Sequence, residues 1–294
     1  MRAVRVHEHL LSRADISRKD RDRAQHALAL DFLKAGLLDR AEVALHKLQG
    51  SDFEGEALLA LLGIYERSRD WPRAKDIAQK LDEAEQGSFS GRLSHYLCEE
   101  AELAQRSGDQ ATALALLEEA VQRAPQLARG WMALSAHKAM GGDARGAFEA
   151  LRKLHTHAPQ GMPLAAAALA DLAGQTGQQE EAMRLLLEAQ SRAPSIDITE
   201  ALASLSEGPA VRRAHYLKHL EREPSLVITA KWLDGETLSD PQAQERVKLS
   251  LDQASAPLRR YRCAACGFEA RQHFWQCPGC QAWDSYPARR VEEL

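Results

Sequence analysis

The segment WMALSAHKAMGGDARGAFEALRKLHTHAP, residues 131–159, decides the fold, because it reads as two helices joined by a short turn. In its second half, Ala147, Leu151 and Leu154 follow the i, i+4, i+7 spacing that places side chains on one helix face. The glycines of GGDARG separate this helix from the one before it, and Pro159 follows its last turn. The segment therefore predicts a helix–turn–helix unit with one apolar seam.

The same unit recurs on both sides of this segment. Pro125, Pro159 and Pro194 close the similar stretches QRAP, THAP and SRAP, so they recur at intervals of 34 and 35 residues. The equivalent apolar triplets are Ala41, Leu45, Leu48; Ala74, Ala78, Leu81; Ala113, Leu117, Ala120; Ala147, Leu151, Leu154; and Ala182, Leu186, Ala189. Five consecutive units between about residues 22 and 194 predict a stack of helix pairs.

A period of about 34 residues is that of the tetratricopeptide repeat, and these units resemble that family. The family's W, L, A, F, A and P positions are occupied by Trp131, Leu134, Ala147, Leu151, Leu154 and Pro159. Lys138 replaces the expected tyrosine. The resemblance implies an all-α, tetratricopeptide-type α-solenoid. The composition agrees, because aromatic residues make up only 5% of the chain, which disfavours a β-sandwich or barrel.

The repeat pattern fades after residue 194. Residues 195–258 read as degenerate helices, with AVRRAHYLKHLEREP followed by a polar connector that ends in SAPLRR. We therefore expect a helical repeat domain over residues 1–258 and a separate module over residues 259–294. Residues 2–11 read as the second helix of a repeat whose first helix is missing, so we expect a chain truncated at its N-terminus or started at an internal methionine.

The C-terminal module carries the chemistry. Cys263-x-x-Cys266 and Cys277-x-x-Cys280 are separated by ten residues, and each pair can form a knuckle that aims two thiolates at one metal ion. Gly267 follows the first knuckle, where a positive φ eases the chain past the metal, whereas Gln281 stands after the second, where rubredoxin usually has glycine. We expect a four-cysteine metal-binding site, rubredoxin-like or zinc-ribbon, that holds one iron or zinc ion. The expected mini-core comprises Tyr261, Phe268, Phe274, Trp275, Trp283 and Tyr286.

Three functional classes remain open from these residues, and the first is a non-catalytic adaptor that binds other proteins. All four ligands are protein sulfurs, which leaves no open position for hydrolytic chemistry, and no catalytic residue set is found, so we expect no enzyme. Rubredoxin-like electron transfer is one alternative, and a zinc-ribbon nucleic-acid adaptor is another. The net charge of −4 argues against nucleic acid. Six arginines could nevertheless form a basic patch around the module: Arg259, Arg260, Arg262, Arg271, Arg289 and Arg290.

The tail RYRCAACGFEARQHFWQCPGCQAW, together with MRAVRVHEHLL and AGLLDRAEVAL, resembles the lipopolysaccharide assembly protein B family of Gram-negative bacteria. The resemblance implies an adaptor at the cytoplasmic face of the inner membrane, held there by an N-terminal helix that we expect to be missing from this sequence. It implies partners: the membrane AAA+ metalloprotease, the lipid A pathway deacetylase that this protease degrades, and other lipopolysaccharide assembly proteins. It also implies iron in a rubredoxin-like module, held by Cys263, Cys266, Cys277 and Cys280, that packs on the repeats. The chain as given is expected in the cytosol, and a homodimer is compatible with it.

The first helix of each repeat lines the concave face in the tetratricopeptide family. By register, the polar residues that would face a partner there are Arg23, His26, Glu66, Arg67, Glu102 and Arg106. His215 and His219 share a helix face four residues apart, but Tyr216 follows the first of them where a zinc hydrolase needs glutamate. We expect these two to be ordinary surface histidines.

Overall fold

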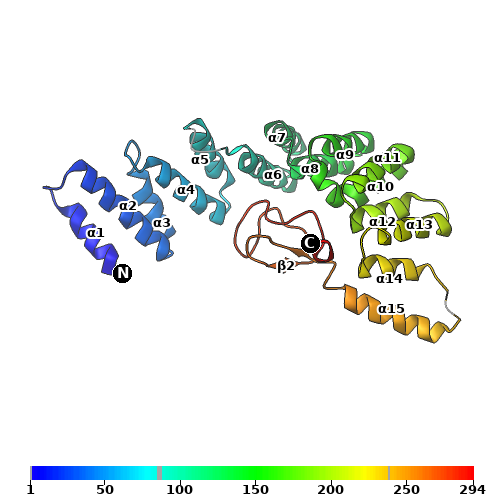
Figure 1. The fold of residues 1–294 in the computed structure, drawn as a ribbon. Helices are drawn as coiled ribbons and strands as arrows, with labels where there is room; N and C mark the ends of the chain where they lie inside the picture. The colour runs from blue at the N-terminus through cyan, green and yellow to red at the C-terminus, as the bar shows by residue number, and fades with distance from the viewer. Residues whose placement is uncertain (1, 85–87, 238) are drawn as a thin grey trace. The chain divides into compact units, whose positions relative to one another are not determined.

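The computed structural model describes residues 2–84, 88–237 and 239–294, and nearly all the regular structure in these ranges is helical (Figure 1). The chain divides into two compact units, Met1–Arg123 and Ala124–Leu294. Each unit is a succession of helices in which each helix contacts the next along the chain. The helix pairs predicted from the sequence periodicity are therefore confirmed.

The first unit contains seven helices among its described residues: α1 (Arg2–Ser12), α2 (Arg18–Lys34), α3 (Leu38–His46), α4 (Glu54–Ser68), α5 (Trp71–Glu83), α6 (Ser90–Arg106) and α7 (Gln110–Arg123). The first anchor of each predicted triplet, Ala41, Ala74 and Ala113, has no exposed surface. A methyl group at these positions lets neighbouring helices approach closely, while the larger anchors Leu45 and Leu117 fill the seam beside them.

The second unit continues with α8 (Ala128–Met140), α9 (Ala144–His157), the 3-10 turn η1 (Pro159–Gly161), α10 (Met162–Thr176), α11 (Gln179–Arg192), α12 (Ile196–Leu205), α13 (Pro209–Leu220), α14 (Leu226–Asp234) and α15 (Pro241–Ser255). Ala147 and Ala182 are again fully buried at the seams. Gly142 ends the turn between α8 and α9 with φ 82°, a left-handed conformation that glycine adopts without strain.

The prediction of a polar connector that ends in SAPLRR is wrong, because α14 and α15 occupy most of that stretch. Local capping explains both helices. The Ser225 side chain accepts a hydrogen bond from the Ile228 N–H at the start of α14. Asp240 accepts from the N–H groups of Gln242 and Ala243 at the start of α15. These caps satisfy orphan donors where the apolar periodicity is too weak to mark a helix.

The expectation for the histidine pair is wrong for His219, which is only 3% exposed. Its Nδ1 lies 2.9 Å from the Thr199 hydroxyl of α12, so the packing of α13 on α12 takes it into the interior. Burial lowers the pKa of His219 and, to the same effect, the pKa of His215, whose Nε2 lies 2.9 Å from the Ser206 hydroxyl. The lowered pKa favours the neutral form of both histidines, of which only His219 is buried.

The chain ends in a small irregular module with little regular structure. It contains β1 (Tyr261–Arg262) and β2 (Glu269–Ala270), which pair antiparallel, and the 3-10 turn η2 (Val291–Glu293). Helix α15 ends at Ser255, and the domain boundary at 258/259 stays a prediction. None of the helices in the described ranges combines the length and the hydropathy that a bilayer crossing requires.

The fully buried seam alanines make a test of the repeat packing. Replacing Ala147 with leucine would force extra methylene groups into a close helix contact, and we expect this to lower the free energy of unfolding by about 1–3 kcal/mol. Urea denaturation followed by circular dichroism measures the change. The matched control is Ala136→Leu, at an exposed position of α8, which should shift the stability by less than about 0.5 kcal/mol. Equal stability of the two variants would contradict the seam assignment.

Candidate metal centre

The four predicted cysteines converge on one point. Their sulfur atoms all lie within 4.8 Å of one another, with Cys263 Sγ 3.8 Å from Cys280 Sγ and Cys266 Sγ 3.7 Å from Cys277 Sγ. Four sulfurs at about 2.3 Å from a tetrahedral metal ion would be separated by about 3.8 Å. The cluster therefore has the size that a metal ion with four thiolate ligands requires.

The two knuckles share one backbone design. In the first, the Gly267 N–H donates to the Cys263 carbonyl and the Cys263 N–H donates to the Phe268 carbonyl, both at 2.9 Å. In the second, the Gln281 N–H donates to the Cys277 carbonyl and the Cys277 N–H donates to the Ala282 carbonyl, again both at 2.9 Å. Gly267 has φ 78° and Gln281 has φ 63°, so a non-glycine residue holds a left-handed conformation at the position where the sequence departs from rubredoxin.

The electrostatics of the cluster favour a cation. Burial opposes ionisation of the Cys263 thiol, but its hydrogen bonds with the Ser285 hydroxyl and with backbone N–H groups outweigh it and lower the pKa of Cys263 to about 6. Cys277 is likewise shifted downward, because backbone N–H groups outweigh its burial. The Phe268 N–H favours the Cys266 thiolate, but desolvation and hydrogen bonds to the other sulfurs outweigh it and raise the pKa of Cys266 to about 12. A bound zinc or iron ion would stabilise all four thiolates together.

The aromatic residues only partly form the predicted mini-core. Tyr261 and Tyr286 are buried with Cys263 and Cys277, and Leu164 of helix α10 packs against this cluster. The prediction is wrong for Phe268, which is 44% exposed and lies against Gly279 of the second knuckle. The core of the module is therefore completed by a helix of the repeat array rather than by its own aromatic residues alone.

The last residues of the chain join the module to two helices of the second unit. Glu292 accepts hydrogen bonds from the Ser225 hydroxyl at 2.6 Å and from the N–H groups of Leu226 and Val227, at the N-terminal end of α14. Glu293 accepts from the Ile196 N–H at 2.7 Å, at the N-terminal end of α12. Both carboxylates lie where unpaired N–H groups and the helix dipole favour negative charge.

Arg290 adds a second link between the module and α12. Its guanidinium donates to both carboxylate oxygens of Asp197, at 2.9 and 2.6 Å, and lies 4.2 Å from the ring centroid of Tyr261. A third donor reaches the Arg259 carbonyl at 2.8 Å. Together, Arg290, Glu292 and Glu293 form what we call the C-terminal clamp. The packing of the module on the repeats, implied by the family resemblance, is confirmed.

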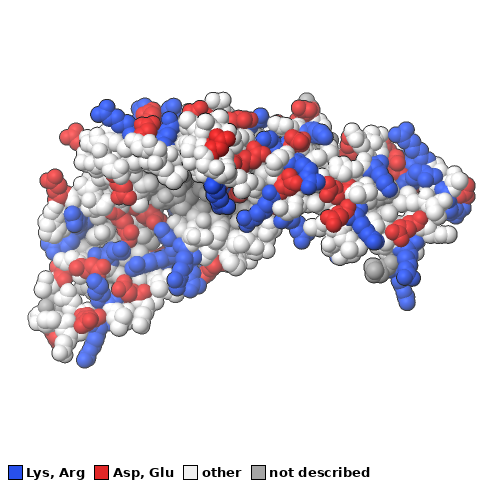
Figure 2. Space-filling model, turned by 180° about the vertical axis from the view of Figure 1, so that it is seen from behind, with Lys and Arg blue, Asp and Glu red and all other residues white. Residues whose placement is uncertain are grey.

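The arginines around the module do not gather into an uninterrupted basic patch. Arg260 and Arg262 pair with Glu269, Arg259 lies 3.5 Å from Asp252, and Arg290 belongs to the clamp. Figure 2 shows Lys and Arg interspersed with Asp and Glu over the face in view. The pairing leaves little unopposed charge for a polyanion to use at these four positions.

The six residues predicted to face a partner all lie on α2, α4 and α6 of the first unit. Arg23 and Arg67 are exposed, and Glu102 pairs with Arg106 at 3.4 Å. His26 and Glu66 are engaged within the unit: the His26 ring stacks on Phe53 with centroids 4.9 Å apart, and Glu66 accepts a hydrogen bond from the Tyr96 hydroxyl. Their role in partner binding stays a prediction.

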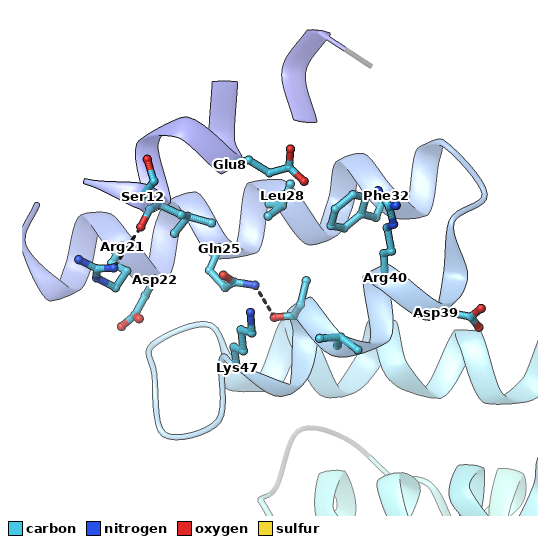
Figure 3. Close-up of a pocket in the computed structure, with 13 residues that line it drawn as sticks. Glu8, Ser12, Arg21, Asp22, Gln25, Leu28, Phe32, Asp39, Arg40 and Lys47 are labelled. Atoms are coloured by element: carbon cyan, nitrogen blue, oxygen red, sulfur yellow. Dashed lines mark hydrogen bonds between the residues drawn. The ribbon is translucent and has the colours of Figure 1, made fainter. Parts of the chain in front are cut away.

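Two cavities were missed by the sequence reasoning, and none of those six residues lines either. The first, of about 770 Å³, lies against α1, α2 and α3 (Figure 3). Leu28 and Phe32 contribute apolar surface, and the Gln25 side chain donates to the Ala44 carbonyl at 2.9 Å. Its charged lining residues are Glu8, Arg21, Asp22, Asp39, Arg40 and Lys47.

The second cavity, of about 570 Å³, lies beside the metal module. Its walls come from segments far apart in the chain, so no local motif indicates it.

The cysteine cluster predicts that the chain loses its bound metal when two of the four ligands are replaced. Serine at both Cys277 and Cys280 should abolish metal binding, because structural sites of this kind contribute about 10–16 kcal/mol of apparent binding free energy. We expect about one metal ion per chain in the wild type and below about a tenth in the variant, with loss of the near-UV aromatic signal. Elemental analysis and circular dichroism measure both. Cys98→Ala, which removes the cysteine outside the module, should retain the metal; stoichiometric metal in the double variant would contradict the site.

The clamp predicts that removing the charge of Glu292 lowers the stability of the second unit. Glu292→Gln leaves the side chain its size but weakens three charge-assisted hydrogen bonds, and we expect a loss of about 1.5–3 kcal/mol in the stability of the second unit. Thermal unfolding followed by tryptophan fluorescence measures it. Glu245→Gln, at an exposed position of α15, is the matched control and should be close to neutral. If both variants melt together with the wild type, the clamp does not stabilise the unit.

Comparison with known proteins identifies the module and its context. Residues 261–286 match the family model of a rubredoxin metal binding domain. The chain is 27% identical to lipopolysaccharide assembly protein B of Escherichia coli strain K12, over 100% of this chain and 78% of that protein. It is 24% identical to the protein of the same name from Haemophilus influenzae, over 97% and 74% of the two chains.

Among solved structures, the C-terminal part of a TPR repeat-containing protein from Cytophaga hutchinsonii is similar, with a TM-score of 0.46 and 12% identity over 81% of this chain and 94% of that one. The predicted fold class, tetratricopeptide-type helices followed by a four-cysteine module, is confirmed by the helix pairs of the structure, the cysteine cluster and the family match of the module. The predicted resemblance is confirmed as well: this chain is similar along its whole length to lipopolysaccharide assembly protein B.

Proposed function

We propose that this chain works in lipopolysaccharide assembly as a non-catalytic adaptor. The proteins that it resembles over its whole length carry the name lipopolysaccharide assembly protein B. The observation that carries the adaptor role is the closed four-sulfur cluster fastened to a helical repeat array. Such arrays offer extended surfaces for protein binding, and a site with four protein ligands leaves no coordination position for a substrate.

The metal would act through structure. When bound, an iron or zinc ion supplies four metal–sulfur bonds that cross-link the two knuckles. The residues of the chain then set where the module lies: Glu292 and Glu293 hold it at the starts of α14 and α12, and Leu164 of α10 completes its core. Surfaces on the module and on α8–α14 would thereby present one fixed arrangement to a partner.

The partners proposed here follow from the family resemblance. The adaptor would hold the lipid A pathway deacetylase, or the membrane AAA+ metalloprotease, in one orientation, so that the protease degrades the deacetylase and limits lipopolysaccharide synthesis. Other lipopolysaccharide assembly proteins are further candidates. The site of action would be the cytoplasmic face of the inner membrane.

Electron transfer is the second candidate, because Cys266 and Cys280 are exposed and would bring the edge of a metal site to the surface. Iron with a reversible absorbance change and a reductase partner would support it. Zinc in the purified protein would exclude it, since zinc has no redox chemistry.

The adaptor role is tested by affinity capture from a Gram-negative lysate with mass spectrometric readout. We expect the wild type to recover the deacetylase or the membrane protease, and the Cys277→Ser, Cys280→Ser double variant to recover less than about a tenth as much, because its module no longer holds its shape. Cys98→Ala serves as the matched control. Recovery of a reductase or of nucleic-acid proteins in their place would contradict the proposal, as would equal capture by the double variant.

A further inference from the structure

The cavity beside the metal module has the size and walls of a ligand site. Its volume of about 570 Å³ falls within the range of about 300–1,000 Å³ for small-ligand pockets. Leu164 of α10 and Ile198 of α12 line it on the helical side, and Trp275 and Tyr286 line it on the module side. The cavity therefore lies within the second unit, where the clamp holds module and helices together.

Most of the lining is apolar, and the charged side chains in it differ in whether they have an interaction partner. Arg192 is paired with Glu188. Asp284 also has an interaction partner. Arg289 differs: across residues 2–84, 88–237 and 239–294, no side chain forms a hydrogen bond or an ion pair with its guanidinium. Its guanidinium is therefore available to a ligand in this cavity.

The clamp explains why Arg289 stays unpaired. Burial raises the pKa of Glu293, the hydrogen bonds that its carboxylate accepts from the N–H groups of Arg290 and Ile196, each at 2.7 Å, oppose this shift, and the charge of Arg289 opposes it least. The neighbouring Arg290 takes the carboxylate of Asp197. The carboxylates of Glu293 and Asp197 are thus committed to other donors, and Arg289 lines the cavity with no side-chain partner among the described residues.

We propose that this cavity binds the C-terminal end of a partner protein, with the last apolar side chains between Leu164 and Tyr286 and the terminal carboxylate on Arg289. A guanidinium recognises a carboxylate through two parallel hydrogen bonds, and capture of a C-terminal carboxylate is a recurrent mode of peptide recognition. Apolar walls supply the affinity, and one cation fixes the direction of the chain.

The chain end is favoured over an internal acidic segment because of the size of the cavity. An internal segment needs room for the chain on both sides of its acidic residue, whereas a terminus brings a carboxylate and its apolar neighbours into a small pocket and ends there. The inference deepens the proposed adaptor role, on which its biological meaning rests, by naming the kind of partner segment that the module and helices would hold.

Fluorescence anisotropy on the purified full chain tests this inference without any cellular partner. The probe is a fluorescein-labelled hexapeptide pool whose last three positions are mixtures of Leu, Ile, Val, Ala and Phe, with a free C-terminal carboxylate. The same pool as a C-terminal amide, and a free-acid pool with Ser, Thr and Gln at those positions, are compared with it. We expect the apolar free acid to bind at least about tenfold more tightly than either comparison pool.

Variants then separate charge recognition from folding. Arg289→Gln should reduce the affinity for the free acid to that for the amide, and Arg289→Lys should recover part of it because the charge returns. Arg184→Gln, at an exposed arginine of α11 outside the cavity, is the matched control and should bind as the wild type does. Metal content and thermal unfolding of each variant establish that it is folded.

Equal binding of the acid and amide pools would overturn the inference, and so would an Arg289→Gln variant that binds like the wild type. Binding of dodecanoate to the cavity, with no binding of any peptide pool, would assign the site to a fatty acid and would also overturn it. These results are independent of the affinity capture. If the partners are still recovered while the peptides fail to bind, the adaptor role stands and the pocket assignment falls.

Discussion

The carboxylate of Glu292 at the N-terminal end of α14 is the contact on which the placement of the metal module depends. It satisfies two backbone donors and the Ser225 hydroxyl at a point where the helix itself has no acceptor to offer. Glu293 does the same for the first N–H of α12, and Arg290 reaches Asp197 one residue further along that helix. Three side chains within four residues thus fix two helix starts and the module to one another.

The module needs this support because it is too small to fold on apolar burial alone. Tyr261, Tyr286 and two of the cysteines are its buried cluster, and Leu164 of α10 completes it from outside. The metal site and the clamp have separate structural roles. The four sulfurs would join the two knuckles through a metal ion, whereas the clamp holds the module on α12 and α14. A cavity with largely apolar walls lies where the module meets α10 and α12, and among the described residues no side chain pairs with its Arg289.

Local patterns in the sequence predict much of this molecule. The repeat seams follow from alanine at a fixed spacing, since Ala41, Ala74 and Ala147 are all fully buried, and the metal ligands follow from the spacing of four cysteines. What could not be predicted depends on contacts between distant residues. Glu292 meets Ser225 across 67 positions and Glu293 meets Ile196 across 97, and neither acidic residue belongs to any motif. The burial of His219 and the cavity were missed for the same reason, because both arise from tertiary packing. Helix α15 was missed because the local cap of Asp240, rather than apolar periodicity, marks its start.

Hydrogen exchange at the amides of Ile196, Leu226 and Val227 tests the central claim most directly, because these donors bond to the clamp and lie far along the chain from the cysteines. The account predicts that removing the metal with a chelator speeds exchange at these three amides by at least about tenfold, while the seam amides of Ala147 and Ala182 keep their protection. Unchanged protection of all three after complete metal removal would contradict it, since the clamp would then hold the helices independently of the metal centre.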